Sequence, residues 1–171
     1  MIQKETKFVI LTGAGISAES GIQTFRDSNG LWENHRIEEV ATPEGWKANP
    51  QLVWNFYQQR RKQLLEVEPN QGHEALVQLE NYFDNFLLVT QNVDDLHERA
   101  GSENLIHMHG ELAKLRCEAC HHVDDMMDDE HLGEAFLTCL HCEGRLRPHI
   151  VWFNEMPMRM AEIEKALSEC E

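Results

Sequence analysis

The chain has 171 residues, of which 42% are hydrophobic and 26% charged, a composition typical of one globular domain and not of a disordered segment. Thirty acidic residues against fifteen basic ones give a formal net charge of −15. This charge opposes binding to a nucleic-acid backbone and favours basic partners such as lysine-rich peptides, although solubility alone is the simpler explanation for it.

Short apolar runs alternate along the chain with segments of helical character. The expected elements are strands over 7–12, 86–89 and 104–108, and helices over 51–67, 72–83, 93–100 and 160–168. Asn49 and Pro50 are suited to begin the long helix, and Gly101 to close the short one. In the second helix, Leu76, Leu79, Tyr82 and Phe83 are expected on roughly one face. Strands separated by helices predict an α/β fold with a Rossmann-like parallel sheet.

The N-terminus and the hydropathy pattern indicate where the protein resides. Met1 to Glu5 lead almost directly into the first strand, which leaves no room for a signal peptide. No apolar run approaches the roughly 20 residues that span a bilayer. We therefore expect a cytoplasmic protein whose five cysteines are reduced thiols or metal ligands.

A glycine turn follows the first strand. Gly13-Ala14-Gly15-Ile16-Ser17 should open a helix, whose N-terminus favours a pyrophosphate. The match to the dinucleotide-binding pattern is partial, because Ala18 replaces its third glycine, a substitution that the pattern tolerates. By itself, this motif fits a dinucleotide site and a simple strand-to-helix turn equally well.

Four cysteines form two pairs, Cys117-x-x-Cys120 and Cys139-x-x-Cys142, within the spacing window of a four-thiolate zinc site. A closed sphere of four thiolates makes the zinc structural. A redox pair and unrelated buried thiols are the alternatives. Cys170 lies outside the pattern, and the neighbouring His121, His122 and His141 are expected to be solvated and not to coordinate the metal.

Polar side chains follow the second and third strands. Gln91, Asn92 and Asp94 come after one strand and His109 after the other, and the carboxyl ends of parallel strands form the ligand-binding edge of such sheets. An imidazole there can move a proton near neutral pH, although a lone His at this place is more often structural.

The long helix carries a run of polar residues that begins with Tyr57 and Arg60, three apart and so on one face. Arg61 and Lys62 follow, and a solvated charged face is the default interpretation of such a run. Alternatively, the phenol and the guanidinium of the first pair grip a carboxylate together.

Taken together, these segments resemble the sirtuins over nearly the whole chain. The resemblance rests on Gly13 to Arg26, on Thr90-Gln91-Asn92-Val93-Asp94-Asp95-Leu96-His97, on His109-Gly110-Glu111-Leu112, and on the four-cysteine module that follows. It implies an NAD-dependent protein-lysine deacylase with zinc, which transfers the acyl group of a modified lysine to the ribose as nicotinamide leaves.

The resemblance also implies roles for individual residues. His109 would act as general base on a ribose hydroxyl, with Asn92 and Asp94 positioning the ribose and the nicotinamide amide. The implied cofactor-binding residues are Gly13, Ala14, Gly15, Ile16, Ser17, Ala18, Glu19, Ser20, Gly21, Thr24, Phe25, Arg26, Trp32, Gln91, Asn92, Val93 and Asp94.

The closest branch is the bacterial group that also removes acidic acyl chains. Ala41 would leave room for succinyl or malonyl groups, and Tyr57 with Arg60 would bind their carboxylate. Val151 and Phe153 resemble the loop on which the peptide pairs as an added strand. Asn154 stands where this group usually has Gly, and Asn tolerates positive φ better than most residues.

The expected organisation is a Rossmann-like part over 1–113, a zinc module over 114–147, and a substrate loop returning to the sheet over 148–171. Sirtuins continue with further strands, so we expect a C-terminally truncated sheet, an apolar edge over 8–11, and no activity or very weak activity from this chain alone. Two other functions fit parts of the pattern: an NAD-dependent protein ADP-ribosyl transferase and a non-catalytic zinc-ribbon module.

Overall fold

The computed structural model describes residues 3–22, 31–32, 35–125, 132–133 and 135–170. The chain divides into two compact units, each assembled from separate segments. Residues 1–24, 67–109 and 157–171 form the first, called here the sheet unit, and residues 25–66 and 110–156 form the second, the cysteine unit. Within the described part of the chain, no helix has the length and apolar character that crossing a bilayer requires.

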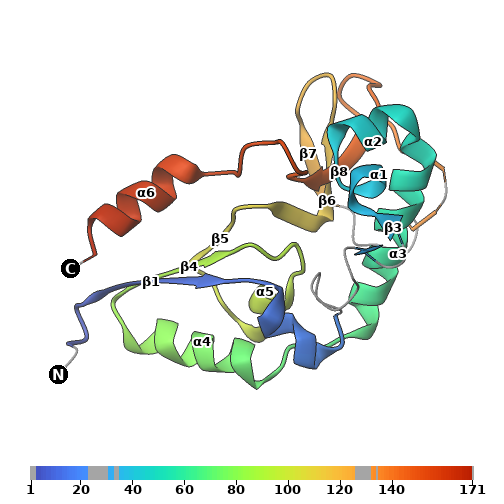
Figure 1. Ribbon diagram of the computed structural model, residues 1–171. Coiled ribbons are helices and arrows are strands. Elements are labelled where there is room, and N and C mark those ends of the chain that lie inside the picture. The colour runs from blue at the N-terminus through green and yellow to red at the C-terminus, as the bar shows by residue number, and fades with distance from the viewer. Residues whose placement is uncertain (1–2, 23–30, 33–34, 126–131, 134, 171) are drawn as a thin grey trace. The chain divides into compact units, whose positions relative to one another are not determined.

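The sheet unit contains a three-stranded parallel sheet in the order β1-β4-β5, formed by β1 (Lys7–Thr12), β4 (Asn85–Thr90) and β5 (Leu105–His107). Lys7 pairs with Asn85 and Thr12 with Thr90, while Leu88 to Thr90 pair with β5. The predicted parallel sheet is therefore confirmed, and its strands end together at Thr12, Thr90 and His107 (Figure 1).

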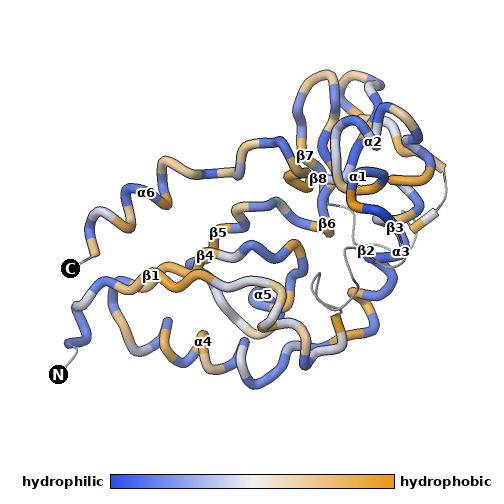
Figure 2. The backbone as a smooth tube through the Cα atoms, viewed as in Figure 1, coloured by the Kyte–Doolittle hydropathy of each residue, from blue (hydrophilic) through white to orange (hydrophobic). Residues whose placement is uncertain are grey.

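Helices cover both faces of this sheet because neighbouring strand residues point to opposite sides. Phe86 and Leu88 pack with Leu76 of α4 (Gln71–Tyr82). Val89 and Ile106 pack with Ile163 of α6 (Met160–Ser168) on the other face. Orange apolar stretches therefore run along the strands in Figure 2.

Two shorter elements complete the sheet unit. The glycine turn opens the 3-10 helix η1 (Ala14–Ser20), and α5 (Leu96–Ala100) ends at Gly101 with φ 110°, as predicted for its closing glycine. In α4, Leu76 is buried and Phe83 packs beside it, but Leu79 and Tyr82 are 38% and 57% exposed. The sheet therefore covers only part of the predicted apolar face of this helix.

The cysteine unit begins with a two-stranded hairpin, β2 (Leu31–Trp32) and β3 (His35–Arg36), and three helices. These are α1 (Ile37–Val40), α2 (Pro43–Ala48) and α3 (Pro50–Glu66). Asn49 Oδ1 accepts a hydrogen bond from Leu52 N–H at 3.1 Å, which confirms the predicted start of the long helix. In α3, Arg61 is buried and donates to Leu112 O at 2.6 Å, so it does not belong to a solvated charged face.

An antiparallel sheet in the order β7-β6-β8 forms the rest of the cysteine unit, from β6 (Gly110–Cys117), β7 (Val123–Asp125) and β8 (Leu146–Ile150). The sequence analysis assigned no strands to these residues. Trp46, Trp54 and Trp152 are almost fully buried, and Trp152 packs against both Trp46 and Tyr57. Large aromatic side chains of this kind supply most of the apolar area that a small unit can bury.

Candidate active site and metal centre

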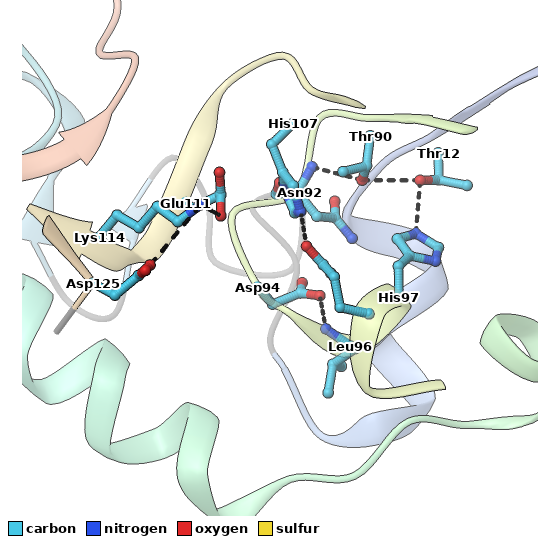
Figure 3. Close-up of polar contacts among 11 residues, drawn as sticks. Thr12, Thr90, Asn92, Asp94, Leu96, His97, His107, Glu111, Lys114 and Asp125 are labelled. Atoms are coloured by element: carbon cyan, nitrogen blue, oxygen red, sulfur yellow. Dashed lines mark hydrogen bonds and ion pairs between the residues drawn. The ribbon is translucent and has the colours of Figure 1, made fainter. Parts of the chain in front are cut away.

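The carboxyl ends of β1 and β4 carry a connected set of polar side chains. Thr12 Oγ1 donates to Thr90 Oγ1 at 2.9 Å, and Thr90 Oγ1 also accepts from Asn92 N–H at 3.0 Å. His97 Nε2 lies 3.0 Å from Thr12 Oγ1, and the close-up in Figure 3 shows these groups linked by successive hydrogen bonds. Burial lowers the pKa of His97 to about 4, so this imidazole is neutral at pH 7. Its role here is structural, as a hydrogen-bond donor to Thr12.

Ser17 connects the glycine turn to the residues that follow β4. Its hydroxyl donates to Asp94 Oδ2 at 3.0 Å and accepts from Asn92 Nδ2 at 3.0 Å. All three side chains are at most 6% exposed. Burial raises the pKa of Asp94, while the hydrogen bond from Ser17 opposes that shift. Three residues predicted from two separate motifs therefore form one buried hydrogen-bonded group.

His73 completes this group from the first turn of α4. Asn70 N–H donates to His73 Nδ1 at 3.2 Å, so the ring hydrogen is on Nε2, 3.5 Å from Ser17 Oγ. Asn70 also donates through Nδ2 to Ile16 O at 2.7 Å and to Ser20 Oγ at 2.9 Å. Neither residue was predicted from the sequence, in which the only signal was a histidine three positions after a candidate helix cap, Asn70.

The imidazole of His109 lies at the same strand ends. Its Nδ1 is 3.1 Å from the carbonyl oxygen of Gln91. Because a carbonyl only accepts, Nδ1 carries the hydrogen, and Nε2 of the neutral ring keeps its lone pair for a proton. Gly13 lies against the side chain of Gln91, since a Cβ at Gly13 would lie 3.2 Å from Gln91 Oε1.

His107, two positions before His109, lies against the carbonyl oxygen of Asn92, the residue after Gln91. Its Nδ1 is 3.0 Å from Asn92 O, and its Nε2 is 2.6 Å from Glu98 Oε1. Both ring nitrogens therefore face acceptors, which requires a doubly protonated ring. Burial raises the pKa of Glu98, but the hydrogen bond and the charge of His107, together with a backbone hydrogen bond and the charge of His97, outweigh burial and hold that pKa below its ordinary value. The sequence analysis missed this pair, which depends on the approach of α5 to β5.

The remaining predicted cofactor residues of the sheet unit line the turn and η1. Ala14, Gly15, Ala18 and Glu19 are exposed, and a Cβ at Gly15 would meet no heavy atom within 4 Å. A dinucleotide can approach the backbone closely only where there is open space in front of it. Gly21 has φ 100° and ends η1, and Val93 is half-buried. Thr24, Phe25, Arg26 and the side chain of Trp32 lie outside the described residues.

The predicted acyl-binding residues belong to the cysteine unit. Tyr57 is fully buried, and its hydroxyl oxygen accepts a hydrogen bond from Trp152 Nε1–H at 3.0 Å. Burial raises the pKa of Tyr57, so the phenol keeps its proton for donation. Arg60 is half-buried, with its guanidinium 5.4 Å from the centre of the Phe56 ring.

The loop after β8 is held by one buried cation. Arg147 donates to both carboxylate oxygens of Glu155 at 2.9 Å, and its guanidinium carbon lies 3.5 Å from the centre of the Trp152 ring. Phe153 N–H donates to Ala41 O at 3.0 Å, and Val151 is half-buried. Asn154 has φ 73°, so the expectation that Asn tolerates this glycine-like position is confirmed.

The four predicted cysteines lie together in the cysteine unit. Their sulfurs are all within 4.8 Å of one another, with Sγ–Sγ distances of 3.5 Å for Cys117–Cys142 and 3.6 Å for Cys120–Cys139. Sulfurs placed tetrahedrally about 2.3 Å from a zinc ion are roughly 3.8 Å apart. The cluster thus fits one zinc ion, and the arrangement does not match unrelated buried thiols.

Both cysteine pairs adopt the same turn. His121 N–H donates to Cys117 O at 3.1 Å and Glu143 N–H to Cys139 O at 2.9 Å, and both donors have positive φ. Backbone N–H groups of Cys120 and Ala119 point at Cys117 Sγ and lower its pKa to about 6, despite the opposing effect of burial. Such donors stabilise the thiolate form that binds metal.

Comparison with known proteins agrees with this geometry. The family model described as "Sir2 family" matches residues 13–171. An NAD-dependent protein deacylase of Pasteurella multocida is 58% identical over 173 residues, which cover 98% of this chain and 73% of the relative. A solved Sir2 homologue variant in complex with ADP-ribose has a TM-score of 0.85 at 39% identity, covering 97% of this chain and 68% of the other. A Sir2 homologue–NAD complex has a TM-score of 0.79 at 41% identity, covering 96% and 62%. The chain thus spans about two thirds of the length of the structures that it matches.

Proposed function

Because the chain belongs to the Sir2 family, we propose that the protein removes acyl groups from lysine side chains of proteins and consumes NAD in doing so. The observation that carries this proposal is the imidazole of His109. Its Nδ1–H is fixed on Gln91 O and its Nε2 retains a lone pair, while Ser17, Asn92 and Asp94 form a buried hydrogen-bonded group in the same unit. The zinc and cofactor requirements follow from the same family.

Bound NAD supplies an electrophilic ribose carbon and nicotinamide as the leaving group. We assign to His109 the removal of a proton from a ribose hydroxyl through Nε2. Asn92 and Asp94 orient the ribose and the nicotinamide amide, and Ser17 fixes both side chains through its hydroxyl. The exposed backbone of Ala14 and Gly15 receives the pyrophosphate. Thr24, Phe25, Arg26 and Trp32 are proposed to complete this site on the resemblance alone.

The four cysteines hold a structural zinc ion. Cys117, Cys120, Cys139 and Cys142 fill all four positions of a tetrahedral ion, so no site is left for a reactive water. The metal would therefore join the two turns and take no part in bond making. This role agrees with our proposed organisation of a zinc module over 114–147 between a Rossmann-like part over 1–113 and a returning segment over 148–171.

The substrate is an acyl-lysine within a protein or peptide. Ala41, Tyr57 and Arg60 are proposed to receive the acyl chain, and the backbone at Val151 and Phe153 to pair with the peptide. The phenolic proton of Tyr57 and the guanidinium of Arg60 suit a terminal carboxylate, so succinyl and malonyl groups are accepted beside acetyl. We place the protein in the cytoplasm and assign it no nucleic-acid or membrane partner, in agreement with its charge of −15.

The test uses the full-length gene product, NAD, and two peptides carrying acetyl-lysine or succinyl-lysine. We expect bare lysine, free nicotinamide and O-acyl-ADP-ribose by mass spectrometry. ADP-ribose attached to protein would instead identify an ADP-ribosyl transferase. Absence of nicotinamide release with both peptides would leave only a zinc-bearing binding module.

A further inference from the structure

Three potential metal ligands outside the four-cysteine cluster meet in the cysteine unit. They are His122, Asp124 and His141, and one ligand atom from each lies within 4.8 Å of the other two. His122 Nε2 is 2.9 Å from Asp124 Oδ1, and the centres of the two imidazole rings are 3.8 Å apart. From the sequence alone, both histidines were expected to be solvated and not to coordinate metal.

The backbone holds two of these ligands on one side of a strand. His122 directly precedes β7, in which Asp124 pairs with Leu115 of β6. Cys117 N–H donates to His122 O at 2.8 Å, so the register of the ladder continues through His122. Residues two apart in a strand point to the same face, which explains why the imidazole of His122 and the carboxylate of Asp124 meet.

The third ligand comes from the second cysteine pair. His141 stands between Cys139 and Cys142, and its N–H donates to Cys139 Sγ at 3.4 Å. The turn that carries it is closed by Glu143 N–H on Cys139 O. His141 is thus fixed by the same backbone that shapes the four-thiolate cluster, and its ring reaches that of His122 from a different segment.

We propose that His122, Asp124 and His141 form a second metal site, which binds a divalent first-row transition ion such as Ni²⁺ or Zn²⁺. A hydrogen bond between His122 and Asp124 requires only two side chains and does not account for the second imidazole. Two imidazole nitrogens and one carboxylate oxygen are a ligand set that these ions prefer over Ca²⁺ or Mg²⁺. The N–O distance of 2.9 Å matches two neighbouring ligands about 2.0–2.2 Å from one ion. Water would fill the remaining positions, unlike in the closed cysteine cluster.

The experiment is a calorimetric titration of the untagged, zinc-loaded full-length protein with Ni²⁺. We expect one Ni²⁺ to bind per chain while the zinc content stays at one. His122→Ala, His141→Ala and Asp124→Asn should each weaken Ni²⁺ binding by about tenfold or more. His121→Asn is the matched control, because His121 is the adjacent exposed imidazole, has φ 62° that Asn tolerates, and lies outside the cluster.

Zinc content, measured by mass spectrometry of the metal, shows whether each variant keeps the four-cysteine fold. Variants that keep their zinc and lose Ni²⁺ binding, beside an unaffected His121→Asn, support the site. Ni²⁺ binding that is unchanged in the three variants, or that falls equally in His121→Asn, overturns it. The readout is independent of deacylation, so failure of the proposed enzymatic function leaves this test intact.

Discussion

Tyr57 and Arg60 are three positions apart on α3, one turn of helix, with the phenol fully buried and the guanidinium half-buried. We expect Arg60→Met to reduce desuccinylation far more than deacetylation. Only the succinyl group has a terminal carboxylate, and the substitution removes the guanidinium that would bind it. A hydrogen bond to a charged group contributes about 1.5–3 kcal/mol, which corresponds to roughly 10- to 150-fold in kcat/KM. Parallel assays on the two peptides measure the ratio, and an equal loss of both activities would refute the assignment.

His107 is a positioning residue for the neighbouring active-site backbone. It donates to Asn92 O and to Glu98, while the side chain of Asn92 bonds to Ser17. His107→Leu leaves a carbonyl of a buried residue without its donor, at a cost of about 1–3 kcal/mol. We expect a higher KM for NAD and a smaller change in kcat.

His107→Gln is the control, because a side-chain amide keeps one donor and should restore part of the NAD affinity. Nitrogen NMR of the unmodified protein adds a direct readout: both ring nitrogens of His107 should carry hydrogen. A His107 ring with a single hydrogen at neutral pH would contradict the assignment.

At the scale of elements, the two cysteine turns depend on the absence of a side chain at Gly144. A Cβ at this position would lie 2.9 Å from Cys117 Sγ and 3.2 Å from Cys142 Sγ, closer than real Cβ atoms approach without displacement. We expect Gly144→Ala to weaken zinc binding by about tenfold or more, measured by competition with a chromophoric chelator. Gly133→Ala should leave it unchanged, since a Cβ there meets nothing nearer than 4.0 Å. Zinc affinity that is unchanged in Gly144→Ala would argue against a metal between these sulfurs.

The parallel sheet could be predicted from sequence because its strands contain short apolar runs that end in polar residues. The antiparallel sheet of β6, β7 and β8 could not. Its strands carry charged residues such as Lys114, Arg116 and Arg147 between their buried apolar residues, which interrupts the apolar pattern that indicates a strand. In the site, motifs pointed to Ser17, Asn92, Asp94 and His109. His73 and His107 were not predicted, because their roles arise from contacts between separate elements.

At the scale of the whole molecule, β1 lies at the edge of the sheet among the described residues and pairs there with β4 alone. Leu11 on this strand is 60% exposed. Exposed apolar edge strands promote association between chains, and a charged side chain on such an edge opposes it. We expect Leu11→Lys to reduce aggregation of the 171-residue chain, measured by light scattering over a range of concentrations.

Leu79→Lys is the matched control, since Leu79 is a partly exposed leucine on α4, away from the strand edge. It adds the same charge to the same chain. Equal gains in solubility from both variants would show that net charge, and not the strand edge, governs association.

The interleaving of the two units along the chain has a consequence for the order of folding. Lys7 pairs with Asn85, and residues 25–66 of the cysteine unit lie between them in sequence. Closing so long a loop costs conformational entropy before the pairing of β1 with β4 can compensate for it. During synthesis, β1 therefore cannot pair until β4 has been made. The four cysteines of the metal cluster are synthesised later still. The topology therefore leaves β1 without its parallel partner until residues 85–90 have been made, and unpaired strands of this kind are prone to misassociation.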